Sequence, residues 1–173
     1  MQPYLFPYIG YFQLINSVDK FVIYDDVNYF KKGYVNRNSI YLDGAGHRFT
    51  LPIMSASQNK KINELNYNSG TDKLLKTIKR AYSKSKRFDD IYPIIESIIS
   101  ASERNVASVN YQSIKAVYDY LNLTKEILIS SELKFNRTNS AADNLISITK
   151  YINGSVYINS PGGKALYSQA QFS

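Results

Sequence analysis

The sequence contains no cysteine, no tryptophan and a single histidine, His47, and each absence removes a class of chemistry. Without cysteine the chain has no disulfide, no thiolate nucleophile and no cysteine-ligated zinc. With one histidine it has no site in which two imidazoles hold a metal. His47 stands beside Arg48 next to a predicted turn, where we expect it to be exposed rather than catalytic.

Long hydrophobic runs are also missing. No apolar stretch reaches the roughly 18 residues needed to cross a bilayer, and the N-terminus lacks the charged and then apolar pattern of a signal peptide. With 173 residues, of which 44% are hydrophobic, the chain is long enough for one domain with a core. We therefore expect a cytoplasmic globular protein.

Positive charge is concentrated in one segment. The net charge is +7, and residues 60–87 hold nine Lys or Arg against only Glu64 and Asp72, so this segment accounts for the whole excess. Such a run is usually the solvated face of a helix. The alternative is a surface for phosphate, nucleic acid or an anionic membrane. Nucleic acid is the less favoured partner, because the apolar stripe through Leu74 and Ile78 predicts that one face is buried.

The hydrophobic pattern predicts alternating helices and strands. A helix over 9–18 precedes an apolar strand over 21–24, and a strand ending at Gln2 would complete a parallel βαβ start. The later predicted elements are hairpin strands 35–42 and 48–53 with a turn at 43–46, a strand over 61–67, helical stripes at 74–82, 91–99 and 106–121 with Thr71 and Asn105 as N-caps, a strand over 127–129, a helix over 145–152 ending at Asn153-Gly154, a strand over 156–158, and a helix over 163–172. This order favours one α/β domain over residues 1–173, with a mixed, mostly parallel sheet flanked by helices and a β-hairpin insertion; the alternative is an α+β fold.

The first residues carry an unusual aromatic signal. Residues 2–15 read Gln-Pro-Tyr-Leu-Phe-Pro-Tyr-Ile-Gly-Tyr-Phe-Gln-Leu-Ile. A core does not require two prolines, a glycine and three tyrosine hydroxyls at fixed places. One interpretation is that Tyr4, Tyr8 and Tyr11 stack on a sugar or a nucleobase; the other is that they are core aromatic residues.

Asp25 and Asp26 directly follow the strand over 21–24. Neighbouring side chains on a strand point to opposite faces, so we expect one carboxylate to face a cleft as a general base. The other would pair with Arg37, a lysine or a helix N-terminus. A divalent ion is the less favoured alternative, because no third carboxylate stands at a readable spacing, and we predict no metal site.

A polar segment, Asn36-Arg37-Asn38, follows shortly after Lys31. On a strand the two asparagines would face one way and Arg37 the other. The guanidinium fork suits a substrate carboxylate or phosphate, although a structural pair with one of the aspartates is an equal alternative. Lys31 would reach an anionic substrate or be solvated.

Near the end of the chain, a predicted strand runs into a glycine-rich turn that opens a predicted helix. In this arrangement Ser160, Gly162 and Gly163 would present backbone N–H groups to an anion at a helix N-terminus. The segment lacks the spacing of a Walker loop. The alternative is an ordinary turn.

The segments 2–15, 24–27, 36–38 and 158–163 resemble the signatures of the WbqC-like family of bacterial proteins, and the resemblance runs from residue 2 to the end. It implies a place in O-antigen or other surface-polysaccharide biosynthesis and a transfer reaction onto an amino sugar. Family members carry an apolar strand before the Gln-Pro pair and continue beyond the Gly-Gly pair. We therefore expect the domain to be incomplete at its C-terminus.

The resulting hypothesis is an acyl or glycyl transferase. Its partners would be a nucleotide-linked amino sugar and an activated acyl donor; the sequence names no cofactor. The predicted base is Asp25 or Asp26, and the predicted substrate-binding residues are Gln2, Tyr4, Tyr8, Tyr11, Lys31, Asn36, Arg37, Asn38, Ser160, Gly162 and Gly163. The alternatives are a non-catalytic binding protein for a nucleotide sugar or glycan intermediate, and anion or nucleic-acid binding through residues 60–87.

Overall fold

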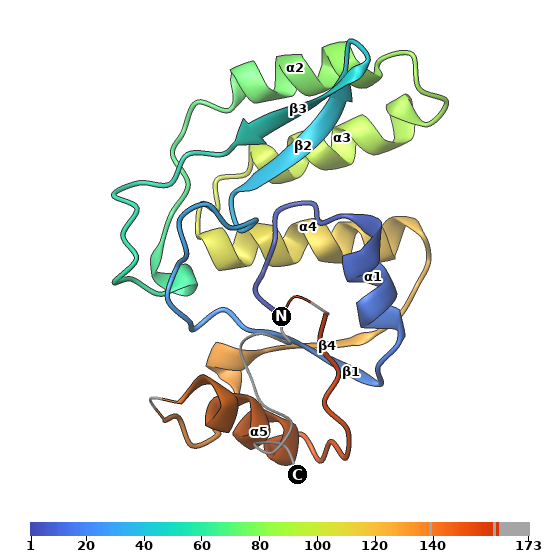
Figure 1. Ribbon diagram of the computed structural model, residues 1–173. Coiled ribbons are helices and arrows are strands. Elements are labelled where there is room, and N and C mark those ends of the chain that lie inside the picture. Colours follow the sequence, from blue (N-terminus) through green and yellow to red (C-terminus); the bar gives the residue numbers. More distant parts are fainter. Residues whose placement is uncertain (139, 161, 163–173) are drawn as a thin grey trace. The chain divides into compact units, whose positions relative to one another are not determined.

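The computed structural model describes residues 1–138, 140–160 and 162 (Figure 1). Its elements, in chain order, are α1 (Ile9–Asn16), β1 (Lys20–Ile23), β2 (Arg37–Leu42), β3 (Ala45–Thr50), the 3-10 turn η1 (Ile62–Glu64), α2 (Asp72–Tyr82), α3 (Phe88–Ile99), α4 (Val106–Tyr120), β4 (Glu126–Ile129), the 3-10 turn η2 (Ser130–Glu132) and α5 (Ala141–Tyr151). They form two compact units. Unit 1 holds Met1, Ile9–Tyr24 and the described residues from Lys125 onward; unit 2 holds Gln2–Tyr8 and Asp25–Thr124.

The centre of unit 1 is the parallel pair β1–β4, with Phe21 opposite Ile127. On the other side of β1, the Met1 nitrogen donates to Val22 O at 2.9 Å, and the Tyr24 N–H donates to Met1 O at 2.7 Å. This is the hydrogen bonding of a parallel neighbour. Met1 therefore lies where the predicted strand ending at Gln2 would pair.

Helices lie above and below these two strands in Figure 1. α1 buries Tyr11 and Ile15, and the Tyr11 ring lies edge-on to Phe21 with centroids 5.5 Å apart. An edge-to-face aromatic pair stabilises the packing by more than the burial of its apolar surface alone. α5 buries Leu145 and Ile148. The predicted helices over 9–18 and 145–152 and the predicted strands over 21–24 and 127–129 are confirmed, with small shifts at their ends.

The end of α5 confirms the predicted Asn153-Gly154 cap. Asn153 adopts a positive φ of 58°. Its N–H donates to Lys150 O at 3.0 Å, and the Gly154 N–H donates to Thr149 O at 2.8 Å. These two hydrogen bonds form a Schellman motif, which satisfies the last carbonyls of the helix.

The hairpin of unit 2 is confirmed, but its turn is tighter than predicted. β2 and β3 pair antiparallel with Leu42 opposite Ala45, so only Asp43 and Gly44 form the turn. Both have positive φ, 51° and 83°. That combination is typical of a type I′ turn, whose twist matches the twist of the strands. Ala45 therefore begins the second strand rather than lying in the turn.

Three helices complete unit 2, as the apolar stripes predict. α2 packs against β2 and α3, and α3 packs against α4. A core cluster of Ile40, Leu75, Ile78 and Ile99 joins the hairpin to these helices. Of the two predicted N-caps, Asn105 accepts a bond from Ser108 N–H at 3.1 Å, whereas Thr71 precedes α2 without a side-chain cap bond.

A buried polar cluster ties distant segments of unit 2 together. Asn110 on α4 is fully buried, and its Nδ2 donates to Pro3 O at 3.0 Å and Val35 O at 2.7 Å. The Tyr67 hydroxyl lies 2.7 Å from Asn110 Oδ1 and 3.1 Å from Val35 O. Because buried polar groups destabilise a fold unless they are hydrogen-bonded, this cluster fixes how four chain segments meet.

Two predicted strands are wrong. Residues 61–67 form a 3-10 turn over Ile62–Glu64 and only isolated β-bridges at Lys61, Asn66 and Tyr67. The buried Ile62 and Leu65 are three residues apart, as a 3-10 turn requires, and alternation is limited to Leu65 and Tyr67. Residues 156–158 form no strand among the described residues; Val156 is 73% exposed. The predicted helix over 163–172 lies outside the described residues.

The predicted fold class is correct only in its coarse form. The described part of the chain mixes helices with two small sheets, the parallel β1–β4 pair and the antiparallel hairpin, in place of one mixed sheet with an insertion. No helix within the described ranges is long and apolar enough to cross a membrane.

The variant Tyr67→Phe should separate the polar cluster from simple packing. Burial raises the pKa of Tyr67, so its hydroxyl stays protonated in the folded state while the unfolded chain ionises near about pH 10. The stability that this group contributes is complete below about pH 10 and falls above it, by up to about 1.4 kcal/mol per pH unit for one proton. Urea unfolding at about pH 8 should show a loss of about 1–3 kcal/mol, because Asn110 loses its donor.

Between about pH 8 and about pH 11, the Tyr67→Phe variant should lose less stability than the unsubstituted protein, since one ionising group is gone. Tyr41→Phe, at a side chain that is 65% exposed, is the matched control. An equal loss across this pH range in Tyr67→Phe and the unsubstituted protein would show that Tyr67 is not protected in the folded state.

Position 153 offers a second test, in unit 1. Asn153→Gly should keep or slightly raise the free energy of unfolding, whereas Asn153→Ala should lower it by about 1 kcal/mol, because a positive φ strains alanine. Thermal unfolding followed by circular dichroism measures both, with the exposed neighbour Ser155→Ala as the control. If alanine and glycine behave alike at position 153, the helix does not end in a left-handed residue.

Candidate functional site

Three tyrosines form an exposed aromatic surface in unit 2. The Tyr4 and Tyr34 ring centroids lie 5.9 Å apart at a tilt of 55°. Burial raises the pKa of Tyr4, and the neighbouring phenols of Tyr34 and Tyr8 raise it further. Tyr8 is 70% exposed and Tyr34 is 65% exposed. Tyr4 is therefore the half-buried support, while its two neighbours present their rings to solvent, as stacking on a planar or apolar ligand face requires.

A short turn beside this surface carries Phe30, Lys31 and Lys32, all exposed. The Gly33 N–H donates to Phe30 O at 3.2 Å, and a Cβ at Gly33 would lie 3.2 Å from that oxygen. Arg37 Nε donates to Gly33 O at 2.9 Å. Gly33 is thus held through both its N–H and its carbonyl group. The turn that it ends carries one exposed aromatic ring and two exposed ammonium groups.

The guanidinium of Arg37 is anchored at one point only. Its Nε is used by Gly33 O, and its two terminal nitrogens make no further hydrogen bond or ion pair within the described ranges. Its charge also lowers the pKa of the Tyr29 phenol, against the larger raising effect of burial. Of the two predicted roles, the structural pair with an aspartate is absent from this part of the chain. A half-buried, oriented fork of this kind suits a phosphate or a carboxylate.

Asn36 is held inside the protein. It is 5% exposed; its Oδ1 accepts from the Tyr29 hydroxyl at 2.9 Å, and its Nδ2 donates to Leu51 O at 2.9 Å. Both ends of the amide are therefore satisfied by the chain. Asn36 therefore fixes the backbone at the start of the hairpin, next to Arg37.

Asn38 holds the N-terminal motif in place. Its Nδ2 donates to Leu5 O at 3.2 Å and also to Phe6 O. Phe6 has a positive φ of 45°, and its N–H donates to Ser113 Oγ at 3.1 Å. A bulky residue in this conformation, directly before Pro7, is strained. The two side chains over-determine a backbone bend beside the tyrosine surface, as strained residues require.

The two aspartates differ in burial, and the partner seen at Asp25 is Asn63, an amide that the sequence did not indicate. Asp25 is 2% exposed; its Oδ2 accepts from Asn63 Nδ2 at 3.2 Å, and its backbone O accepts from the Asn63 N–H at 3.1 Å. Asp26 is half-buried and therefore more accessible. Among the described residues no three His, Asp or Glu side chains group as metal ligands.

The other predicted residues do not all lie with this set. Gln2 is half-buried in unit 2. Tyr11 is 2% exposed in the core of unit 1, so its core interpretation is the one that the geometry supports. In unit 1, Ser160 is half-buried and Gly162 is exposed. Gly163 lies outside the described residues.

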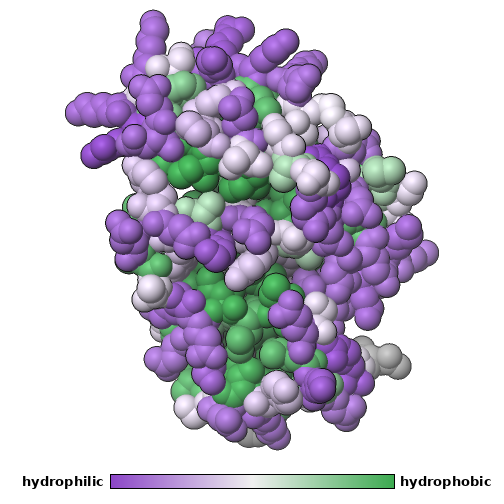
Figure 2. All heavy atoms as spheres, turned by 180° about the vertical axis from the view of Figure 1, so that it is seen from behind, coloured by the Kyte–Doolittle hydropathy of each residue, from purple (hydrophilic) through white to green (hydrophobic). Residues whose placement is uncertain are grey.

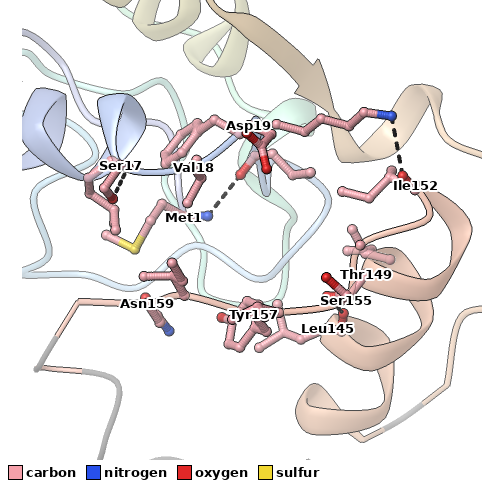
Figure 3. A pocket seen from close by; sticks show the side chains of 18 of the residues that line it. Met1, Ser17, Val18, Asp19, Leu145, Thr149, Ile152, Ser155, Tyr157 and Asn159 are labelled. Atoms are coloured by element: carbon pink, nitrogen blue, oxygen red, sulfur yellow. Dashed lines mark hydrogen bonds between the residues drawn. The ribbon is translucent and has the colours of Figure 1, made fainter.

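Unit 1 has a cavity of its own, with a volume of about 430 Å³ (Figure 3). Its walls come from the end of α1, from β1, from the last turns of α5 and from the extended segment that follows α5. The lining residues are Met1, Leu14, Ser17, Val18, Asp19, Lys20, Phe21, Val22, Tyr24, Leu145, Ile148, Thr149, Ile152, Asn153, Gly154, Ser155, Val156, Tyr157, Ile158 and Asn159. Ile158 and Asn159 directly precede the predicted anion-binding turn.

The cavity is lined by apolar and polar groups in nearly equal measure. Figure 3 shows Val18 and Leu145 on opposite sides, with Tyr157 and Asn159 along the extended segment. At the rim, Lys20 Nζ donates to Ile152 O at 3.2 Å and lies 3.8 Å from a carboxylate oxygen of Glu126. A space of this size and composition fits a small organic molecule with an apolar body.

Sequence reasoning missed several residues of these sites. Phe30 and Tyr34 lie just before the polar segment, and their exposure depends on the closed turn that Arg37 stabilises. Asn63 comes to Asp25 from a segment predicted as a strand. The signal for Tyr34 is its position as an aromatic residue between Lys31 and Arg37. No local sequence pattern indicates Asn63.

Comparison with known proteins agrees with the resemblance in the motifs. The model of the WbqC-like protein family matches residues 2–173. A curated relative, "Uncharacterized protein Rv1507c" of Mycobacterium tuberculosis, is 25% identical over 171 residues, which span 96% of this chain and 73% of the relative. No solved structure matches the chain. Because the family model covers nearly the whole sequence, including the tyrosine surface, the aspartates and the cavity segment, the chain belongs to the WbqC-like protein family.

Proposed function

We propose that this protein is a transferase of surface-polysaccharide biosynthesis, which joins an acyl or glycyl group to the amine of a nucleotide-linked amino sugar. The observation that carries the proposal is the grouping in unit 2 of exposed tyrosine rings with an oriented, half-buried Arg37 fork. Aromatic faces bind sugars and bases by stacking, and the guanidinium binds phosphate. A nucleotide-linked substrate implies the cytoplasm as the compartment.

In this proposal the amino sugar nucleotide lies on unit 2. Tyr34 and Tyr8 stack on its base or sugar, and Arg37 with Lys31 and Lys32 binds the diphosphate. Two cations and a fork near one turn match the charge of a diphosphate, and charge-assisted bonds are stronger than neutral ones. Asn36 and Asn38 act indirectly, by holding the backbone from which these side chains project.

The chemical step needs one base. The amine nitrogen attacks the acyl carbonyl carbon, its proton passes to a carboxylate, and the donor's leaving group departs with the electron pair of the broken bond. Asp26 is the better candidate for this base because it is the more accessible of the pair. Asp25, buried against Asn63, is a positioning residue. The residues predicted to bind the anionic donor remain Ser160, Gly162 and Gly163 of the glycine-rich turn.

Ligand binding tests the first half of this proposal. Tyr34→Ala should weaken binding of a UDP- or dTDP-linked amino sugar by about 10-fold or more, because loss of one stacking ring is worth about 1–3 kcal/mol. Isothermal titration calorimetry measures the change. Tyr41→Ala is the matched control, since Tyr41 is also 65% exposed and lies in the same unit. Equal affinities of the two variants would place the ligand elsewhere.

Turnover tests the second half. Asp26→Asn and Asp25→Asn should each lower kcat at least about 10-fold with the circular dichroism spectrum unchanged. The substitution at Asp26 should leave KM nearly unaltered, because a base acts on the transition state. If neither substitution lowers turnover, the base is another group. Saturable binding without product under any acyl or aminoacyl donor would favour the alternative of a non-catalytic binding protein, which the same aromatic surface would serve.

A further inference from the structure

The positive charge of the chain is gathered on one part of unit 2. α2 and the connection to α3 carry Lys73, Lys76, Lys79, Arg80, Lys84, Lys86 and Arg87, all exposed. Two of them are paired: Arg80 with Asp43 at 2.7 Å and Arg87 with Asp90 at 3.3 Å. The five lysines have no carboxylate within ion-pair distance in the described part of the chain. This surface, named here the lysine surface, therefore carries an excess of unpaired positive charge.

An apolar groove lies directly beside the lysine surface. It has a volume of about 280 Å³ and is lined by Ile78, Tyr82, Ser85, Arg87, Phe88, Ile91, Tyr92 and Ile95 from α2, α3 and their connection. The Phe88 and Tyr92 rings stack with centroids 4.9 Å apart, and Lys79 Nζ lies 5.8 Å from the Tyr92 ring centroid. Figure 2 shows hydrophobic residues below a fringe of hydrophilic side chains over this end of unit 2.

Two properties thus occur side by side: unpaired lysines and an open groove walled by aromatic and aliphatic side chains. Cationic side chains around an apolar, aromatic patch are the composition of surfaces that rest on a lipid interface. A nucleic acid would use the lysines but not the groove, where ring faces are already in contact: Phe88 stacks on Tyr92, and Lys79 Nζ lies 5.8 Å from the Tyr92 ring centroid.

We propose that the α2–α3 end of unit 2 docks onto an anionic lipid surface, with the lysine surface against the headgroups and the side chains of the groove at the level of the first methylenes. The charge determines the partner, because a surface with five unpaired lysines is matched by a negatively charged one. Glu96 and the exposed Asp89 on α3 keep the headgroup contact on α2 and the 83–87 connection, so that α3 contributes only its apolar groove side chains to the docking surface.

The docking surface involves neither the tyrosine surface nor the aspartates. It would hold the protein against a membrane through residues that its small-molecule sites do not use. The inference stands independently of the proposed transfer reaction, because it uses other residues and a different partner.

Vesicle flotation tests the proposal. The full chain is mixed with vesicles of phosphatidylcholine alone, or of phosphatidylcholine with about 30% phosphatidylglycerol, at low and at physiological salt. Binding to the anionic vesicles alone is expected, and it should weaken as salt rises. Because each lysine near an anionic surface strengthens partition about fivefold, Lys73→Gln with Lys76→Gln should weaken it about 25-fold.

The matched control is Lys134→Gln with Lys150→Gln, which removes the same charge from exposed positions of unit 1 and should leave flotation unchanged. Phe88→Ser keeps every lysine but should weaken flotation at least about fivefold, through loss of apolar insertion. Circular dichroism confirms that each variant is folded.

Three outcomes would overturn the proposal. Equal binding to neutral and anionic vesicles excludes the charge argument, and equal losses in the two double variants exclude the location. Tight, salt-dependent binding of a single-stranded DNA oligonucleotide, without binding to anionic vesicles, would show that the lysine surface serves nucleic acid instead.

Discussion

The buried amide of Asn110 is the interaction on which the rest of unit 2 depends. It receives the Tyr67 hydroxyl and donates to the backbone at Pro3 and Val35. These partners belong to the N-terminal motif and to the segment that enters the hairpin. A hydrophobic contact would allow such segments to slide, whereas an amide with both ends satisfied accepts one arrangement. The hydrogen bonds of Asn110 thereby help to position the tyrosine surface and the turn that Arg37 holds.

The same logic explains why the N-terminal motif is rich in proline and tyrosine. Pro3 has no N–H to satisfy, so only its carbonyl needs a partner, and Asn110 provides the donor. Asn38 provides a donor to the carbonyl of Leu5. Phe6 is then forced into a strained conformation that turns the chain toward α1. The strain sits next to the candidate site, where rigid placement of rings and charges reduces the ordering that a ligand would otherwise require.

Much of this architecture is readable from sequence because it rests on local chemistry. The Asn153-Gly154 helix end, the Asp43-Gly44 turn and the stripes of α2 to α4 follow from residue preferences at neighbouring positions. The misreadings have the opposite origin. Residues 61–67 have a strand-like composition, but their backbone bonds to Val27 and Asp25 from a distant segment, and local pattern carries no information about such partners.

The candidate site divides in the same way. The sequence singled out Arg37 and the aspartates as residue types, and their accessibility, which decides their roles, came only from the fold. Asn36 illustrates the limit: its motif position suggested substrate contact, whereas its two hydrogen bonds place it inside the frame. An asparagine within a motif that suggests substrate binding can thus have a structural role.

The closed end of α5 has a consequence for chemical ageing. In an open chain, an Asn-Gly pair is the sequence in which the glycine nitrogen most readily attacks the carbon of the side-chain amide. Ammonia leaves, a succinimide forms, and water opens it to aspartate or isoaspartate. Here the Gly154 nitrogen is held by Thr149 O at 2.8 Å, beside the cavity of unit 1. Folding therefore protects Asn153 from deamidation, and aspartate at position 153 in a stored sample, detected by peptide mass spectrometry, would record how often this helix end opens.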